Sequence, residues 1–117
     1  MKTHLIKETT VAEYAKQYAA SRSSFALWIA ALKYADWAEP ADIQDTFPSA
    51  DLLGNGSNRV VFDIGGNKFR LICRYYFGEK ENHLYVKWTG THAEYTQLCK
   101  KNDQYTVNAY YRALWKP

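Results

Sequence analysis

The residues of this sequence best suited to chemistry lie in the short segment from Gly90 to Tyr95. Within it, Thr91 and Glu94 have the spacing of a capping box, in which the two residues satisfy each other's backbone N–H groups where a helix begins. Such a helix would place His92 and Tyr95 on one face, near its positive end, where a phosphate can bind. A histidine there can act as general acid or base near neutral pH. A lone histidine more often caps or packs, so this interpretation needs support from its surroundings.

That support comes from a strand expected at about residues 68–77 and from the strand that follows it. Cations and aromatic side chains alternate there on the side that faces away from the core. They are Lys68, Arg70, Arg74 and Tyr76, joined by Tyr85 and Lys87 from the next strand. This pattern suits a single strand of nucleic acid, since cations hold phosphates and rings stack on bases. A solvent-facing sheet with salt pairs such as Asp63–Lys68 is equally compatible with it.

The elements that must position these residues follow from the hydrophobic periodicity. Apolar residues alternate from residue 59 to Ile64, and Gly65-Gly66 is typical of a two-residue hairpin turn. That turn would place Phe62 opposite Phe69. The third strand is expected at residues 84–89, with Leu84, Val86 and Trp88 on its core face.

Helical spacing predicts two amphipathic helices before this hairpin, at about residues 10–20 and 23–37. Thr10 and Glu13 have the form of a capping box for the first of them. A short strand is expected at residues 3–7 and a turn of helix at 42–46. The predicted fold class is α+β, with two N-terminal helices packed on a small antiparallel sheet and a short C-terminal helix. Residues 1–117 are expected to form a single domain.

The net charge of +3 is unevenly distributed along the chain. Residues 1–57 carry a net charge of −2 and residues 58–117 a net charge of +5. The second half is therefore expected to meet an anionic partner, although a solvated basic face would show the same bias. No apolar run approaches the ~20 residues needed to span a bilayer, and the first residues lack an apolar signal core. We expect a cytoplasmic protein with no membrane contact.

The pattern of cysteines and histidines does not favour a metal site. Cys73 and Cys99 are too far apart for a zinc knuckle or a redox pair, and we expect two reduced, packed thiols. His4, His83 and His92 have no ligand spacing. We therefore expect no cofactor and no metal, and clustered carboxylates for a metal-dependent nuclease are lacking as well.

Two runs of residues together resemble the HigB family of type II toxin–antitoxin toxins. These are Arg59-Val60-Val61-Phe62-Asp63-Ile64-Gly65-Gly66-Asn67-Lys68-Phe69-Arg70-Leu71 and Gly90-Thr91-His92-Ala93-Glu94-Tyr95. They match the family's glycine hairpin and its THxEYD motif, in the right order and at the right separation. The resemblance is close over roughly residues 40–98. The chain departs from the pattern at Asp63, where the family has Asn, at Thr96, where it has Asp, and in residues 99–117, which extend beyond the motif.

The resemblance implies a RelE-like fold and an mRNA interferase that cleaves transcripts in the ribosomal A site. It also implies silencing by a HigA-type helix-turn-helix antitoxin, through which alone the protein would meet DNA. Arg70, His92 and Tyr95 match motif positions, and Lys87 lies near a position where relatives often carry Arg.

The implied reaction is attack of the RNA 2′-hydroxyl on the adjacent phosphate. His92 would be the acid or base, and Tyr95 would donate a second proton or stack on a base. Arg70 and Lys87 would stabilise the developing charge. Lys68, Arg74, Tyr76 and Tyr85 would bind RNA. A competing hypothesis is a non-catalytic module that binds RNA or protein with the same sheet.

Overall fold

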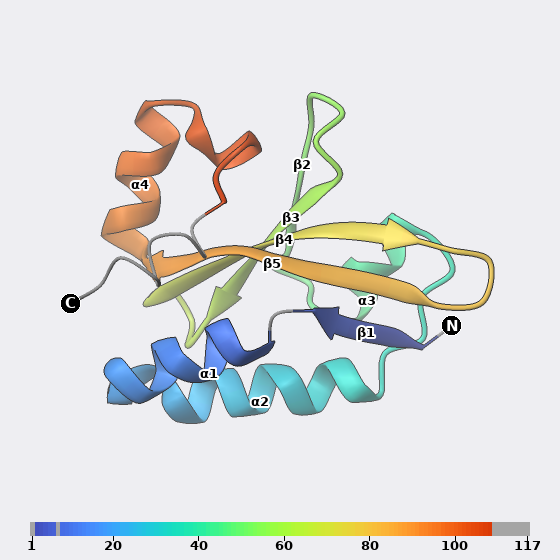
Figure 1. Cartoon of the computed structure of the whole chain (residues 1–117), viewed down its shortest axis with the longest axis horizontal. Coiled ribbons are helices and arrows are strands. Elements are labelled where there is room, and N and C mark those ends of the chain that lie inside the picture. The colour runs from blue at the N-terminus through green and yellow to red at the C-terminus, as the bar shows by residue number, and fades with distance from the viewer. Residues whose placement is uncertain (1, 7, 109–117) are drawn as a thin grey trace.

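The structure is a computed structural model that describes residues 2–6 and 8–108, without the side chains of residues 8–10. Its centre is a five-stranded sheet with the strand order β1-β5-β4-β3-β2 (Figure 1). The strands are β1 (Thr3–Ile6), β2 (Asp51–Leu53), β3 (Arg59–Ile64), β4 (Phe69–Phe77) and β5 (Asn82–Thr91). The class is α+β, as predicted.

The sheet is mixed, which corrects the expectation of an antiparallel sheet. β1 runs parallel to β5, whereas the other neighbouring strands are antiparallel. A parallel pair needs a long crossover connection, and here the whole helical region and the other strands lie between the two partners. The alternation within a short strand such as β1 predicts its faces but not its direction beside a partner, so the sequence did not reveal this pairing.

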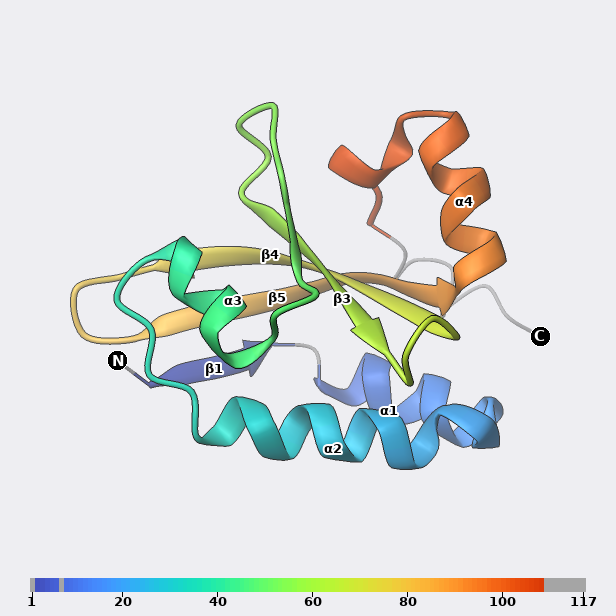
Figure 2. The same cartoon turned by 180° about the vertical axis from the view of Figure 1, so that it is seen from behind.

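Two helices cover one face of the sheet and a third stands on the other (Figures 1 and 2). The first face carries α1 (Glu8–Gln17) and α2 (Arg22–Lys33), and the second carries α4 (His92–Lys100). The shorter elements are the helical turn α3 (Ile43–Thr46) and the 3₁₀ turns η1 (Ala19–Ser21), η2 (Pro40–Asp42) and η3 (Asp103–Tyr105). No helix within the described part of the chain is long and apolar enough to cross a membrane.

The boundaries of the first two helices differ from those predicted. α1 begins at Glu8, so Thr10 lies inside the helix and the expected capping box at Thr10 is wrong. α2 ends at Lys33, four residues before the predicted end. The chain then turns to bury Trp37, whose indole Nε1 donates to Thr46 Oγ1 at 3.0 Å and whose carbonyl oxygen accepts from Asn82 Nδ2 at 2.8 Å. The burial of this large side chain in the core accounts for the early end of α2.

The main core lies between the sheet and the pair α1 and α2. Its largest buried members come from both layers and include Phe25, Trp28, Leu32, Trp37, Ile43, Phe62, Ile64, Leu71 and Leu84. A second, smaller cluster lies on the opposite face, where Val61, Ile72 and Trp88 pack with Tyr95 and Leu98 of α4. The sheet is therefore covered on both faces at the end where α4 begins.

The hairpin between β3 and β4 has the predicted faces but a longer turn. Its four turn residues run from Gly65 to Lys68, and the ladder pairs Phe62 with Leu71 instead of Phe69. A shift of two residues leaves every side chain on its expected face, because the side chains of a strand alternate with a period of two. Gly65 has a positive φ of 67°, and a Cβ there would lie 2.9 Å from Ser24 Oγ of α2. The turn thus needs glycine both for its backbone and for its contact with the helix.

A β-bulge in β5 overturns one expectation about the third strand. Ile72 of β4 pairs with Trp88, but its neighbour Cys73 pairs with Val86, which leaves Lys87 as the extra residue. Val86 therefore faces the main core while Trp88 faces the second cluster. The sequence predicted both on one face, because regular alternation carries no sign of an inserted residue.

Candidate active site

The start of α4 forms as predicted. Thr91 is the N-cap residue, its Oγ1 accepts from the backbone N–H of Glu94 at 3.2 Å, and Glu94 Oε1 accepts from the backbone N–H of Thr91 at 2.8 Å. The backbone N–H of His92 donates to the carbonyl of Lys68 at 3.0 Å, so the helix start is fixed to the hairpin turn. The side chain of His92 is exposed in the first turn of the helix. It is therefore available to a ligand at the positive end of the helix dipole.

Tyr95 lies one turn further on and is half-buried. Its ring centroid is 6.1 Å from that of Trp88, in the second cluster. Burial raises the pKa of the Tyr95 phenol well above its ordinary value, and a hydrogen bond with Cys99 raises it further. The charge of Asp51 acts in the same direction and that of Arg70 in the opposite one. The phenol is therefore protonated at neutral pH, and it lies close enough to Arg70 for the charge of that residue to affect its pKa.

Arg70 is held in place by three neighbours. Its Nε lies 3.0 Å from Asp63 Oδ1, its Nη2 donates to Asn67 Oδ1 at 3.2 Å, and its Nη1 donates to the carbonyl of Phe69 at 3.2 Å. Only 10% of the side chain is exposed. Since a guanidinium has five N–H donors, these contacts within the described part of the chain leave two of them for a ligand. The predicted salt pair between Asp63 and Lys68 is wrong, because the longer turn places Asp63 opposite Arg70 and leaves Lys68 exposed.

The remaining predicted residues lie further along β4 and β5. Arg74 is exposed and pairs with Tyr85 across the ladder, whereas Lys87 is half-buried at the bulge. Tyr76 is 59% exposed, near the far end of β4. With a rise of about 3.3 Å per residue, Tyr76 lies roughly 20 Å from Arg70 along the strand. The structure thus brings together Lys68, Arg70, His92 and Tyr95 at one end of the sheet. It places Tyr76 and Tyr85 toward the other end.

Three further residues lie near Tyr76, Tyr85 and Arg74 on this face, and the predicted RNA-binding residues did not include them. His83 has its ring centroid 6.0 Å from that of Tyr85 and 6.3 Å from that of Tyr76. His4 of β1 lies beside His83, and Glu81 bridges the two, with distances of 2.8 Å to His4 Nε2 and 3.5 Å to His83 Nε2. Arg59 pairs with Arg74 across β3 and β4.

The sequence signals for these residues differ in strength. His83 alternates in phase with Tyr85, and Arg59 occupies the non-core phase of β3, so both could have been identified from parity. The position of His4 depends on the parallel pairing of β1 with β5, which no local pattern reveals.

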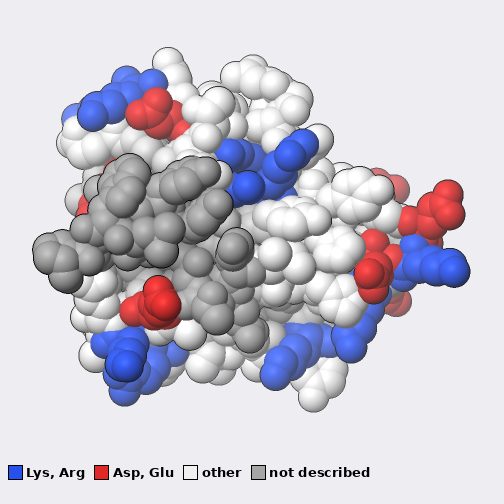
Figure 3. All heavy atoms as spheres, viewed as in Figure 1, with Lys and Arg blue, Asp and Glu red and all other residues white. Residues whose placement is uncertain are grey.

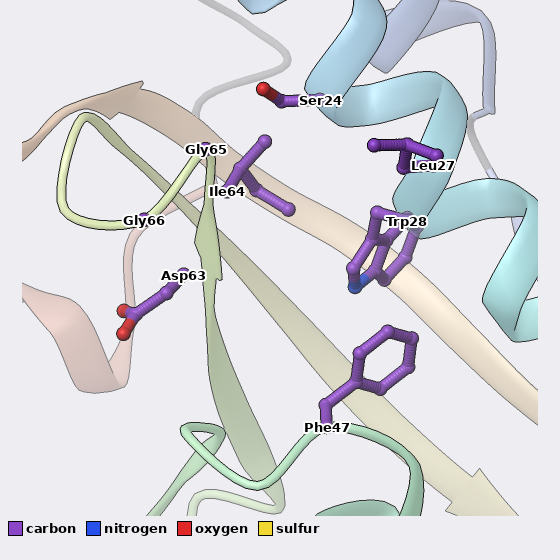
Figure 4. Close-up of a pocket in the computed structure, with 8 residues that line it drawn as sticks. All are labelled: Ser24, Leu27, Trp28, Phe47, Asp63, Ile64, Gly65 and Gly66. Atoms are coloured by element: carbon purple, nitrogen blue, oxygen red, sulfur yellow. The ribbon is translucent and has the colours of Figure 1, made fainter.

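A shallow pocket of about 340 Å³ lies away from this face, between α2 and the β3–β4 turn. Figure 4 shows Leu27, Trp28 and Phe47 around it, whereas Asp63 is directed away from that aromatic side. None of the predicted catalytic residues lines it. Within residues 2–6 and 8–108, no three His, Cys, Asp or Glu side chains cluster as they would to hold a metal ion.

Comparison with known proteins defines the class to which this fold and site belong. Residues 21–98 match the profile of a family described as the RelE-like toxic component of a toxin–antitoxin system. That match spans well over half of the chain, and the chain belongs to this family, the HigB toxins.

Curated relatives agree with this assignment. The chain is 28% identical over 97 residues to the mRNA interferase HigB of Escherichia coli O6:H1 (strain CFT073), covering 83% of this chain and 92% of the relative. It is 24% identical over 92 residues to the mRNA interferase toxin HigB of Escherichia coli (strain K12), covering 79% of this chain and 86% of that protein. The mRNA interferase HigB of Shigella flexneri matches with the same identity and coverage.

Proposed function

We propose that this chain is an mRNA interferase, an endoribonuclease that cuts messages at the end of the sheet where α4 begins. The observation that carries the proposal is that two segments distant in the sequence, the β3–β4 turn and the start of α4, lie side by side. The backbone of His92 is bonded to that of Lys68, and Tyr95 lies within electrostatic reach of Arg70. An exposed imidazole, a protonated phenol and two cations are the groups that cleavage of a phosphodiester requires.

The RNA would supply its own nucleophile in this mechanism. His92 removes the proton of the 2′-hydroxyl, which attacks the adjacent phosphorus and forms a 2′,3′-cyclic phosphate as the 5′-oxygen leaves. Tyr95, whose phenol stays protonated, donates a proton to that oxygen. The two remaining N–H groups of Arg70, with Lys87 and Lys68, stabilise the charge that develops on the phosphoryl oxygens. Acid–base help of this kind is typically worth ~10²–10⁴-fold.

The strand face beyond this site would carry the rest of the message. Arg74 offers an exposed cation, and Tyr76 and Tyr85 offer rings on which bases can stack. Cations and rings of this kind bind single-stranded RNA with little sequence preference. We therefore assign codon preference to the partner that presents the message, which we propose to be the ribosomal A site.

Membership of the HigB family implies an antitoxin, and we propose one of the HigA type, with a helix-turn-helix fold. DNA would then be met only through that partner. A small helix-turn-helix reading frame beside this gene, together with growth arrest on induction of the toxin alone, would support this pairing.

Single substitutions test the catalytic assignment. His92→Ala should abolish cleavage of a translated message, as measured by primer extension, because it removes the base without touching a buried residue. The Arg70→Lys protein should also cleave poorly. Lysine lacks the planar guanidinium that can donate to Asp63 and to a phosphate at the same time. His4→Ala is the matched control, because it removes a partly exposed histidine at the other end of the sheet. Full cleavage by the His92→Ala protein would show that the acid–base assignment is wrong.

The competing hypothesis is a module that binds RNA without cutting it. It predicts tight RNA binding by the wild-type protein, with no cleavage product in the presence of translating ribosomes. The same primer-extension experiment therefore decides between the two.

A further inference from the structure

Arg59, the first residue of β3, is unusual because it is a buried cation. The residue is 6% exposed, yet no ion pair of its guanidinium occurs among the described residues. Its Nη1 donates to the backbone carbonyl of Gln104 in η3 at 3.2 Å. Its direct neighbour across the ladder is a second cation, Arg74. Burial lowers the pKa of Arg59, and the charge of Arg74 lowers it further.

Burying the charge of Arg59 beside that of Arg74 costs free energy unless an anion balances the two positive charges. Removing a charge from water costs several kcal/mol even after relaxation, and a like charge nearby adds to the cost. The other buried arginine of the sheet, Arg70, meets that cost with the carboxylate of Asp63. The hydrogen bond that Arg59 makes within residues 2–6 and 8–108 gives no such compensation, because the carbonyl it reaches carries only a partial charge.

The two arginines lie on the face that carries α4, and solvent reaches them at Arg74. Arg74 is exposed, whereas Arg59 is enclosed between β2, with which β3 pairs, and η3, to which it donates. Figure 3 shows Lys and Arg atoms gathered in this region, over the sheet between α4 with η3 and the β2–β3 connection. An anion bound to Arg74 there would lie beside Arg59, its neighbour across the ladder.

We propose that Arg59 and Arg74 bind a backbone phosphate of the RNA, separate from the phosphate that is cut. Arg74 lies four residues after Arg70 on β4, about 13 Å along the strand, and Arg70 is anchored in the opposite direction by Asn67 of the turn. One phosphate cannot be held at both places. Tyr85, which pairs with Arg74, is placed to stack on the base of the nucleotide held there. This inference rests on the proposed function, because it names a second contact with the same substrate.

The test measures binding of a short, fluorescently labelled single-stranded RNA with 2′-O-methyl groups, which cannot be cut because it lacks the nucleophile. The dissociation constant is measured at several salt concentrations for the wild-type protein, Arg59→Gln and Arg74→Gln. Each lost phosphate contact lowers the magnitude of the log–log salt slope by about 0.7 for a single strand. Each variant should show that change and an affinity about ten-fold lower at low salt, as expected for a charged hydrogen bond.

Lys33→Gln is the matched control, since it removes one exposed positive charge from the end of α2 on the opposite face. It should leave the slope unchanged. Should Arg59→Gln fail to fold, as judged by circular dichroism, Arg74→Gln at its exposed position decides alone. A wild-type slope in Arg74→Gln, or no measurable binding by the wild-type protein, would overturn the proposal. Cleavage of a translated message by the wild-type protein is scored separately, so the phosphate site and the proposed nuclease can fail independently.

Discussion

At the scale of single residues, the two substituted positions within the family motifs make defined structural contacts. Asp63, where relatives have Asn, supplies the carboxylate that pairs with Arg70 at 3.0 Å. Thr96, where the motif has Asp, donates its hydroxyl to the carbonyl of His92 at 3.1 Å, one turn back along α4. The first change therefore adds a negative charge beside the proposed cut site, and the second removes one.

Tyr95→Phe separates the chemistry of the phenol from the packing of its ring. Phenylalanine keeps the contact with Trp88 but has no proton to donate. Because burial raises the pKa of the phenol, Tyr95 can act only as a donor at neutral pH. We expect kcat to fall by about 100-fold, near the lower limit of typical general-acid help, while KM changes little. Single-turnover cleavage measures both.

The pH profile of the wild-type reaction provides a further check. A donor whose pKa is raised keeps its proton through the ordinary titration range of tyrosine, so its loss should not limit the rate below pH ~10. Cleavage by Tyr95→Phe at the wild-type rate would remove Tyr95 from the mechanism and leave it a packing role.

At the scale of elements, the site depends on the junction between β5 and α4. Gly90 is buried at this junction, between Trp88 and the capping carboxylate of Glu94. A Cβ at Gly90 would lie 2.6 Å from Trp88 Cη2 and 2.9 Å from Glu94 Oε1. The absence of a side chain at this position lets the helix start so close to the sheet.

Gly90→Ala should accordingly weaken both the fold and the activity. Overpacking of this kind typically costs 1–3 kcal/mol, and here the buried indole cannot move aside easily. We expect the free energy of unfolding in urea to fall by about 2 kcal/mol, with a loss of cleavage because His92 and Tyr95 are displaced. Gly54→Ala, where a Cβ would meet nothing within 4 Å, should be nearly neutral. Equal stability of the two variants would contradict this account of the junction.

The sequence predicted those features of the elements that depend on local patterns. The capping box of Thr91 and Glu94 was identified because four consecutive residues define it. The faces of the hairpin were identified because a period of two survives an error in turn length. The bulge at Lys87, the direction of β1 and the partner of Asp63 depend on contacts between distant segments, and no local pattern encodes these. For the same reason, the sequence could suggest candidate residues for the site, but not the pairing of Arg59 with Arg74.

At the scale of the whole molecule, the sheet separates two packed layers that contain buried ionisable groups. Cys73 is wholly buried in the main core, and burial raises the pKa of its thiol above the ordinary value of 9.0. Burial raises the pKa of Tyr14 in the same layer and of Tyr95 in the other, above an ordinary value of 10.0. Because the folded state disfavours the charged form of each group, loss of a proton from any of the three lowers the stability of the fold.

These three groups should therefore lower the stability of the protein as the pH rises above 9. In the unfolded chain the Cys73 thiol loses its proton as the pH passes 9.0, whereas the folded chain keeps it, so rising pH favours unfolding. This single group contributes a slope of up to about 1.4 kcal/mol per pH unit. Cys73→Ala should move the onset toward pH 10, where the tyrosines take over. Urea unfolding at a series of pH values measures the onset, and an unchanged onset in Cys73→Ala would contradict the assignment.

The bulge in β5 also bears on how such a toxin can diversify. Because Lys87 is the extra residue, it belongs to neither hydrophobic cluster, while Val86 and Trp88 on either side each anchor one of them. The residue at that position can therefore change between lysine and arginine without repacking either layer. Substitution at this one position would adjust the charge that we propose for RNA cleavage, while the architecture around it stays intact.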